Sequence, residues 1–399
     1  MQQSTGLPES EVLKLGYTID EFKNLGNFPD TIEEFREHPL QMVNTVSKVR
    51  GEFFLEGRRV VVKKGSNLVM PLNDFMKIYN ASHGNVIMGS SLLKDNLKLY
   101  NGENLDNKKL LVWTFGLGWG DILFVQAILR HLKNRYPTCK IKWALPQKYH
   151  TFVKNFDMID SVVPTPFESK HIMRHSYHMH FDALVSGFSQ GKTKNCYDLM
   201  AEFIGLDIPK EELNPKIPIP ISNMKYIKKE IRKLELDTKP FIVIHLKTST
   251  PRRNPSMEFK NNIIDALITD YNIVFIDSAD QKNEINKLIN GRSNCYNLCE
   301  VSRNMTDVLA ILNLARIVVS VDTSIIHMAT AVGTPTYGLY GPFNGELRVS
   351  TYNNCKWVNG TCDISPCLVH SSDVCEHGFP ICYDSIDIQR AIKEIKTLI

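Results

Sequence analysis

The sequence predicts an α/β fold with two doubly wound, parallel-sheet domains and an extra N-terminal α+β module. Three observations lead to this expectation. From Lys109 onward, short apolar runs alternate with segments of helical apolar spacing, as in chains whose strands alternate with helices. Residues 214–222 carry three prolines and are typical of a linker. After this linker the same alternation starts again.

The first α/β domain is expected to open with a strand, a glycine-rich turn and a helix. Residues 110–115 form an apolar run suited to a buried strand, and residues 116–121 contain three glycines. Residues 122–133 have the apolar spacing of a helix. Further strands are expected at 140–145 and 181–185.

The second domain repeats this order, and a helix is expected to close the chain. We expect strands at 241–245, 273–276, 317–321 and 336–340, and helices around 257–269, 280–290 and 306–315. Isoleucines at 388, 392, 395 and 399 form one stripe of an amphipathic helix. The expected divisions are 1–105, 106–222, 223–385 and 386–399, the last being a helix that packs back across the domains.

The N-terminal 105 residues have mixed character. Residues 31–37 are typical of a short helix, and residues 52–64 of a hairpin with Glu56-Gly57 at its turn. Nothing in this stretch indicates chemistry, so we expect an appended module.

Composition narrows the class of protein. Hydrophobic residues make up 43% and charged residues 23% of the 399, which is typical of a globular chain with a real core. The net charge of +4 is too small to indicate nucleic-acid binding by itself. The polar N-terminus, the lack of an apolar run near the ~20 residues of a membrane helix, and nine cysteines suited to reduced thiols predict a cytoplasmic enzyme without a transmembrane segment.

The most informative stretch follows the strand expected to end at Val321. Asp322, Thr323 and Ser324 are all favourable N-cap residues for the next helix. The first turn of such a helix directs N–H groups and the positive end of its dipole beyond the strand ends, which suits a diphosphate. His327 lies one turn further along on the same face. The alternative is a helix that is merely capped and a histidine that packs in the core.

A cationic loop follows the strand at 241–245. It contains Lys247, Thr248, Arg252 and Arg253, and such a set can surround phosphate oxygens. Basic loops are more often simply solvated, but this loop and the Asp322–Ser324 corner are expected at the same edge of one sheet. Together they predict an anion site, with Asp277 as a further candidate in it.

The glycine turn contains Gly118, Trp119 and Gly120 and is followed by Asp121. Its spacing is not that of a dinucleotide-binding turn, so we expect the glycines to let a substrate approach the backbone closely. Asp121 would then face the gap between the domains, where its carboxylate could accept a proton from a hydroxyl group. The alternative for Asp121 is a purely structural helix cap.

These segments resemble a known family. Residues 322–342 resemble the signature of the heptosyltransferase-like glycosyltransferases, glycosyltransferase family nine. Residues 120–132, with Tyr136-Pro137 after them, are similar to that family's first strand-turn-helix, and the cysteines within 366–382 fit its cysteine-bearing tail. The resemblance covers residues 108–399.

The resemblance implies a GT-B fold, in which two Rossmann-like domains face a cleft. It implies that the donor binds to residues 223–385 and the acceptor to residues 106–222, on the side of Gly118, Trp119 and Gly120, with inversion and without a metal. The family's donor-loop lysine falls near Arg252 or Arg253, where its usual Lys-x-Trp-Pro is replaced by Arg-Arg-Asn-Pro. Carried over residue by residue, the resemblance implies that Asp121 is the general base and that Thr248 is a donor-binding hydroxyl. It also implies that the diphosphate loop consists of Asp322, Thr323, Ser324 and His327.

The sequence favours a reaction without a resident metal or cofactor. It contains no Asp-x-Asp triplet, which metal-dependent transferases commonly use, so Lys and Arg are expected to neutralise the diphosphate. Irregular spacing favours packed thiols over a structural metal at Cys355, Cys362, Cys367, Cys375 and Cys382. A polar loop on the acceptor side is favoured over a metal site at His171, His175, His178 and His180.

The predicted function is therefore inverting, metal-independent transfer of a sugar from a nucleotide diphosphate sugar, ADP- or UDP-linked, to a hydroxyl of a lipopolysaccharide-type saccharide. A second candidate acceptor is a hydroxymethylated base in phage DNA. Two further hypotheses are a sugar-nucleotide epimerase or hydrolase, which the same architecture also supports, and a non-catalytic binding module.

Overall fold

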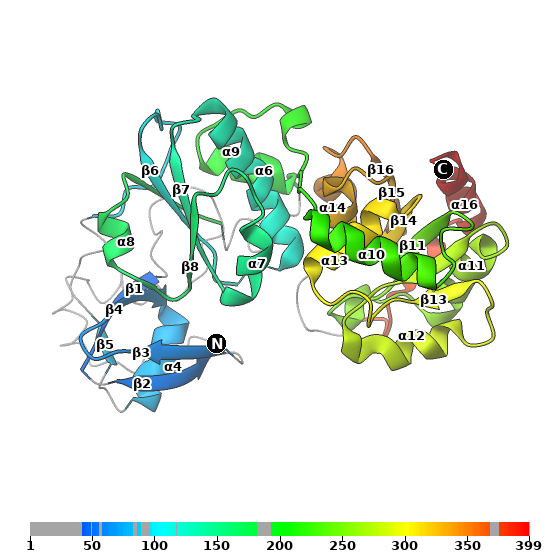
Figure 1. Cartoon of the computed structure of the whole chain (residues 1–399), viewed down its shortest axis with the longest axis horizontal. Helices are drawn as coiled ribbons and strands as arrows, with labels where there is room; N and C mark the ends of the chain where they lie inside the picture. Colours follow the sequence, from blue (N-terminus) through cyan, green and yellow to red (C-terminus); the bar gives the residue numbers. More distant parts are fainter. Residues whose placement is uncertain are drawn as a thin grey trace. The chain divides into compact units, whose positions relative to one another are not determined.

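The computed structural model describes residues 42–48, 50–55, 58–82, 86–88, 96–116, 118–181, 193–367 and 375–398. The helix expected at 31–37 lies outside these residues. The chain divides into two compact units (Figure 1). The first unit takes its residues from 1–117, 132–191 and 198–207, and the second from 118–131, 192–197 and 208–399.

The first unit contains an antiparallel sheet in the order β5-β1-β4-β9 and a separate hairpin, β2-β3. The predicted hairpin is confirmed, because β2 pairs antiparallel with β3 from Gly51↔Val62 to Leu55↔Arg58; its turn lies outside the described residues. The elements are β1 (Met42–Ser47), β2 (Gly51–Leu55), β3 (Arg58–Val62), β4 (Asn67–Pro71), α4 (Leu72–Ala81), β5 (Val86–Met88) and β9 (Phe167–Glu168).

A parallel sheet in the order β10-β6-β7-β8 completes the first unit. Trp113 of β6 and Phe167 of β9 share one hydrophobic cluster, so the antiparallel sheet packs against the parallel one. The elements are β6 (Lys109–Trp113), β7 (Lys140–Leu145), η1 (Gln147–Tyr149), α7 (His150–Val153), β8 (Ser161–Pro164), α8 (Lys170–Met173) and β10 (Tyr177–His180). Helices α6 (Trp119–Arg135) and α9 (Cys196–Phe203) each contribute residues to both units.

The strand expected at 181–185 lies outside the described residues except for Phe181, which belongs to no strand. The strand that pairs with β6 here is β10, Tyr177–His180, which ends just before Phe181. His178 and His180 therefore lie in a buried strand and not in a polar loop. The His180 ring stacks on the Trp113 ring, with the ring centroids 5.3 Å apart. Packing against a large aromatic ring outweighs the polarity of the imidazole at this position.

The second unit is built on a six-stranded parallel sheet in the order β13-β12-β11-β14-β15-β16. This is the 3-2-1-4-5-6 order of a doubly wound Rossmann fold. The strands are β11 (Phe241–His245), β12 (Asn272–Phe275), β13 (Cys295–Asn297), β14 (Val318–Val321), β15 (Thr336–Tyr340) and β16 (Cys355–Asn359). The four strands predicted in this region are confirmed to within a residue at each end.

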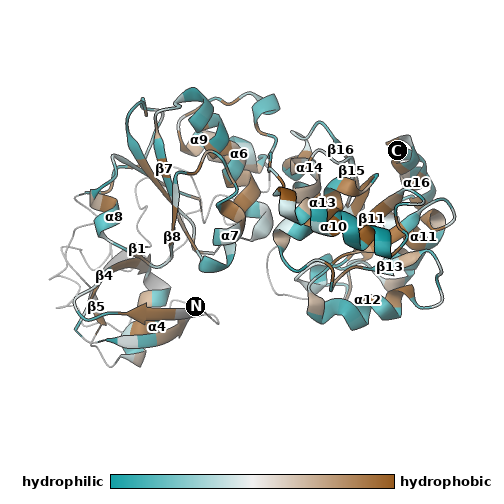
Figure 2. Ribbon diagram, in the orientation of Figure 1, coloured by the Kyte–Doolittle hydropathy of each residue, from teal (hydrophilic) through white to brown (hydrophobic). Residues whose placement is uncertain are grey.

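Helices cover this sheet because alternate strand residues form apolar faces. Ile242 and Ile244 of β11 share a core cluster with residues of α11 and α16, so these helices cover one face. Figure 2 shows the strands as largely apolar beside helices whose other sides are polar. The helices are η3 (Lys210–Glu212), α10 (Ile221–Lys233), η4 (Pro251–Arg253), α11 (Met257–Leu267), η5 (Ala279–Gln281), α12 (Lys282–Ile289), α13 (Met305–Leu314), α14 (Ser324–Ala331), α15 (Glu346–Val349), η6 (Ile381–Ser385) and α16 (Ile388–Thr397). None of the described helices has both the length and the apolar character that crossing a membrane requires.

Candidate functional site

The strand order of the second unit creates a site between β11 and β14. The chain leaves β11 toward one side of the sheet and β14 toward the other, and ligands of doubly wound sheets bind where this reversal occurs. The cationic loop follows β11 and the Asp322–Ser324 corner follows β14, while the strands pair in parallel from Val243↔Val318 to His245↔Ser320. The two predicted binding segments therefore leave the same end of neighbouring strands.

The cationic loop is held in shape by its own polar groups. The Thr248 N–H donates to Asn254 Oδ1 at 2.6 Å, and the Thr248 hydroxyl donates to the Thr250 carbonyl at 2.8 Å. The Tyr383 hydroxyl donates to the Arg253 carbonyl at 3.1 Å. Thr248 is buried, so its hydroxyl serves the loop itself in this structure.

Arg253 joins the loop to the corner. Its Nη1 donates to the Asp322 carbonyl at 3.2 Å and lies 3.3 Å from the Asp322 carboxylate. Its Nε donates to the Thr250 hydroxyl at 3.0 Å. The Arg253 and Asp322 side chains are 11% and 10% exposed, so this ion pair is largely screened from water. Of the two candidate arginines, Arg253 is the one that faces the corner.

The corner caps a helix as the sequence predicts. Thr323 is the N-cap of α14, and its hydroxyl accepts from the Ile325 N–H at 3.3 Å. The same hydroxyl lies 3.3 Å from His245 Nδ1 at the end of β11. Ser324 begins the helix, whose N-terminus carries partial positive charge.

The remaining donor-side candidates lie toward β12 and toward the C-terminal tail. Lys247 hydrogen-bonds to Gln281, and Asp277 Oδ2 lies 3.8 Å from His245 Nε2. Burial lowers the pKa of His245, an effect that Asp277 opposes. Arg252 is buried. Burial raises the pKa of the Cys367 thiol, and the positive charge of Arg252 opposes this increase.

The start of α6 lies against this corner, within the same unit. A Cβ atom added to Gly120 would lie 3.6 Å from Ser324 Cα and 3.0 Å from His327 Cδ2. Gly118 and Trp119 immediately precede it, and Asp121 is partly exposed next to it. The Asp121 carboxylate accepts from the Gly118 N–H at 2.8 Å, so it caps the first turn of α6. The glycine turn and the predicted diphosphate loop are thus neighbours.

His327 is 4% exposed and packs edge-on to Phe124, with the ring centroids 4.6 Å apart. Burial lowers the pKa of His327 to about 4, an effect that Asp322 opposes and Arg348 reinforces. The ring is therefore neutral near neutral pH. Its Nδ1 lies 2.8 Å from the hydroxyl of Tyr352.

Sequence reasoning missed three buried residues around His327. Tyr352 contacts Nδ1, Tyr197 contacts Tyr352 through their hydroxyls at 2.9 Å, and Arg348 lies 3.9 Å above the Phe343 ring. They stand far apart in the sequence and belong to no local motif. Only the tertiary fold brings them together.

Four of the five C-terminal cysteines lie close to one another beside the cationic loop. Burial raises the pKa of Cys382 to about 12, and neighbouring Cys362, Cys367 and Cys375 add to the increase. Cys355 is buried in β16, and burial alone raises its pKa to about 12, so it stands apart from the four. Cys362, Asp363 and His377 also offer ligand atoms within 4.8 Å of one another.

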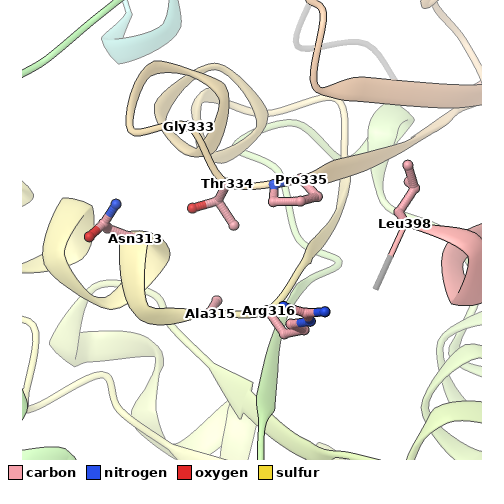
Figure 3. Close-up of a pocket in the computed structure, with 7 residues that line it drawn as sticks. All are labelled: Asn313, Ala315, Arg316, Gly333, Thr334, Pro335 and Leu398. Carbon is pink, nitrogen blue, oxygen red and sulfur yellow. The ribbon is translucent and has the colours of Figure 1, made fainter.

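A cavity of about 240 Å³ lies at the opposite end of the strands (Figure 3). Its lining comes from residues that precede β14 and β15 and from the end of α16, and none of the candidate site residues borders it. The lining residues are Asn313, Ala315, Arg316, Gly333, Thr334, Pro335 and Leu398.

Solved structures share this fold. The family 9 glycosyl transferase from Veillonella parvula DSM 2008 aligns with a TM-score of 0.58 at 15% identity, over 74% of this chain and 98% of its own. The E. coli ADP-heptose LPS heptosyltransferase II aligns with a TM-score of 0.55 at 16% identity, over 73% and 98%. The iron-containing dodecameric glycosyltransferase TibC from enterotoxigenic E. coli H10407 aligns with a TM-score of 0.50 at 12% identity, over 90% of both chains. The predicted GT-B fold with two Rossmann-like sheets is confirmed.

The sequence itself matches one family model. A comparison with curated proteins finds no match. The model of glycosyltransferase family 9 (heptosyltransferase) matches residues 175–374, half of the chain, and this range includes the cationic loop and the Asp322–Ser324 corner. The protein is therefore a glycosyltransferase, and it belongs to glycosyltransferase family 9.

Proposed function

We propose that this enzyme transfers a heptose-type sugar from an ADP-sugar to a hydroxyl of a lipopolysaccharide-type saccharide, with inversion at the anomeric carbon. The family match supports the reaction class. Structural neighbours described as an ADP-heptose LPS heptosyltransferase and as a complex with ADP-D-β-D-heptose support this donor. The observation that carries the proposal is the Arg253–Asp322 pair at the N-terminus of α14, beside the start of α6 that bears Asp121.

The leaving group is a nucleoside diphosphate, whose negative charge grows as the glycosidic C–O bond breaks. The α14 N-terminus and the guanidinium of Arg253 stabilise that charge in a partly dehydrated site. Asp322 fixes the guanidinium through the contacts at 3.2 and 3.3 Å. Lys247 and Arg252 add positive charge to the same loop.

Asp121 is the general base of the proposal. The acceptor oxygen attacks the anomeric carbon from the side opposite the departing phosphate oxygen, and its proton passes to the Asp121 carboxylate. One C–O bond forms as the other breaks, so the configuration inverts. The Gly118 N–H, 2.8 Å from one carboxylate oxygen, holds the carboxylate in place.

We propose that no metal acts on the diphosphate, since this loop supplies lysine and arginine instead. The neighbour TibC is described as iron-containing, which raises the question of a metal site away from the diphosphate. The tail here offers candidate ligands for iron or zinc: Cys362, Cys367 and Cys375 all raise the pKa of Cys382, and Cys362, Asp363 and His377 have ligand atoms within 4.8 Å of one another. The ion would be structural, and the cluster would support the cationic loop through Arg252 and through Tyr383, which bonds the Arg253 carbonyl.

A transfer assay tests the proposal. The protein is incubated with ADP-, UDP-, GDP- and CMP-sugars, with and without a truncated lipopolysaccharide acceptor, and nucleotide release and glycosylated acceptor are measured. We expect release of ADP that requires the acceptor and matches product formation. Release of nucleotide without acceptor would instead indicate a hydrolase or a hydrolysing epimerase, and transfer only to duplex DNA with hydroxymethylated bases would replace the saccharide acceptor.

A further inference from the structure

Three buried side chains form a hydrogen-bonded chain behind the candidate site. The Tyr197 hydroxyl lies 2.9 Å from the Tyr352 hydroxyl, which lies 2.8 Å from His327 Nδ1. Tyr197 and Tyr352 are 0% and 4% exposed, and Phe124 packs edge-on against both Tyr197 and His327. Water therefore does not reach the Tyr197 hydroxyl, at one end of this series of hydrogen bonds.

The number of hydrogens on these three side chains determines which group donates in each hydrogen bond. The two hydroxyls and the neutral imidazole carry three hydrogens, and the two hydrogen bonds use two of them. If Nδ1–H donated to Tyr352, and Tyr352 to Tyr197, the Tyr197 hydrogen would be buried with no acceptor among the described residues. If Tyr197 donates to Tyr352, and Tyr352 to Nδ1, both buried hydroxyl hydrogens are used. An unsatisfied buried donor is costly, so the second arrangement is favoured.

In the favoured arrangement the third hydrogen is on His327 Nε2. This nitrogen lies at the start of α6, 3.6 Å from the position of a Cβ on Gly120. Among the described residues Nε2 has no hydrogen-bond partner. Asp322 and Arg348 are the charged groups that act on the ring, and burial keeps the ring neutral near neutral pH.

We propose that Tyr352 is a positioning residue for sugar transfer: by donating to His327 Nδ1, it keeps Nε2–H available to donate to a substrate oxygen between α14 and the start of α6. The proposal rests on the proposed function for the identity of that substrate. The tautomer of His327 is a property of the free protein and is measurable without substrate.

The test is nitrogen-15 NMR of protein labelled at histidine, with the His327 signals assigned by their loss in His327→Gln. We expect an unprotonated Nδ1 and a protonated Nε2 in the wild type. Tyr352→Phe removes the donor to Nδ1 and should give mixed tautomers. Tyr197→Phe is the matched control, because it removes a buried hydroxyl of the same chain and leaves the Tyr352 donor in place; it should keep the wild-type tautomer.

Kinetics complete the test. Tyr352→Phe should lower kcat/KM about tenfold, as expected for the loss of one well-placed hydrogen bond, and Tyr197→Phe should lower it less. A wild-type ring protonated on Nδ1, a Tyr352→Phe ring that stays wholly Nε2–H, or equal kcat/KM in wild type and Tyr352→Phe would each overturn the proposal. If no sugar transfer is found with any donor, the proposed function fails, while the wild-type tautomer still decides the hydrogen-bond direction.

Discussion

Arg253 contacts both the backbone carbonyl and the side-chain carboxylate of Asp322, although the two residues lie 69 positions apart in the sequence. The contact fixes the distance between the cationic loop and the N-terminus of α14, which are the two halves of the proposed diphosphate site. Because both side chains are nearly buried, this ion pair differs from the solvated pairs elsewhere on the chain.

Replacing Arg253 with Ala should weaken donor binding. The change removes a positive charge from the diphosphate and leaves the Asp322 carboxylate partly buried without its partner. We expect the Kd for ADP to rise about tenfold to a hundredfold, measured by calorimetry. Arg232→Ala is the control, since Arg232 is 74% exposed and lies 3.8 Å from Asp237. An equal effect of the two changes would mean that Arg253 acts only through overall charge.

Gly120→Ala should disturb the contact between α6 and α14. The new methyl group would lie 3.0 Å from His327 Cδ2, so the ring must shift. We expect the free energy of unfolding to fall by about 1 kcal/mol or more, because overpacking exceeds the gain in helix propensity from alanine. Gly116→Ala is the steric control, because its Cβ meets nothing within 4 Å. Denaturant unfolding of the two variants gives the comparison, and equal stabilities would refute the contact.

Acid should destabilise the protein partly through His327. In the unfolded chain the ring binds a proton near the ordinary histidine pKa of 6.5, whereas in the folded chain burial lowers this pKa to about 4. The unfolded state therefore binds more protons as the pH falls from 6.5 toward 4, and stability decreases over that window by about 1.4 kcal/mol per unit.

His327→Gln should lessen this dependence. Between about pH 6.5 and 5, we expect the variant to lose about 1 to 2 kcal/mol less unfolding free energy than the wild type, measured with urea. His175 contributes its own decrease in both proteins, because burial also lowers its pKa to about 4. Identical pH profiles would show that His327 does not titrate as its burial requires.

The metal content of the purified protein tests whether the cysteine cluster holds an ion. If Cys362, Cys367, Cys375 and Cys382 hold a structural ion, elemental analysis should find about one iron or zinc per chain. Cys367→Ser should lose the ion and lower the melting temperature. Cys355→Ser should keep the ion, because Cys355 is buried away from the four. A wild-type protein without metal after anaerobic purification would leave the cluster as packed thiols.

Local patterns explain what the sequence could predict. The strand ending at Val321 and the cap at Thr323 are set within a few residues, so helix α14 and its corner were placed correctly. The cationic loop was placed at the same sheet edge by strand order alone. Strand β10 was not predicted, because His178 and His180 are polar residues that become buried only through Trp113 and the strand's pairing with β6.

Contacts between distant segments could not be predicted. Arg252 and Arg253 are adjacent and chemically identical, and nothing in the sequence near them indicates that Arg253 pairs with Asp322. Gly120 meets His327 across more than two hundred residues, and nothing in the sequence near either residue indicates it. The Tyr197–Tyr352–His327 chain is likewise a product of tertiary packing.

The most direct test of the proposed mechanism separates chemistry from donor binding at Asp121. Asp121→Asn keeps an oxygen that can accept from the Gly118 N–H, so the cap of α6 is preserved. In single-turnover transfer from ADP-heptose, we predict a rate at least about a hundredfold below the wild type, as for the loss of a general base, with the Kd for ADP changed less than about twofold. Transfer by Asp121→Asn at the wild-type rate would contradict the account.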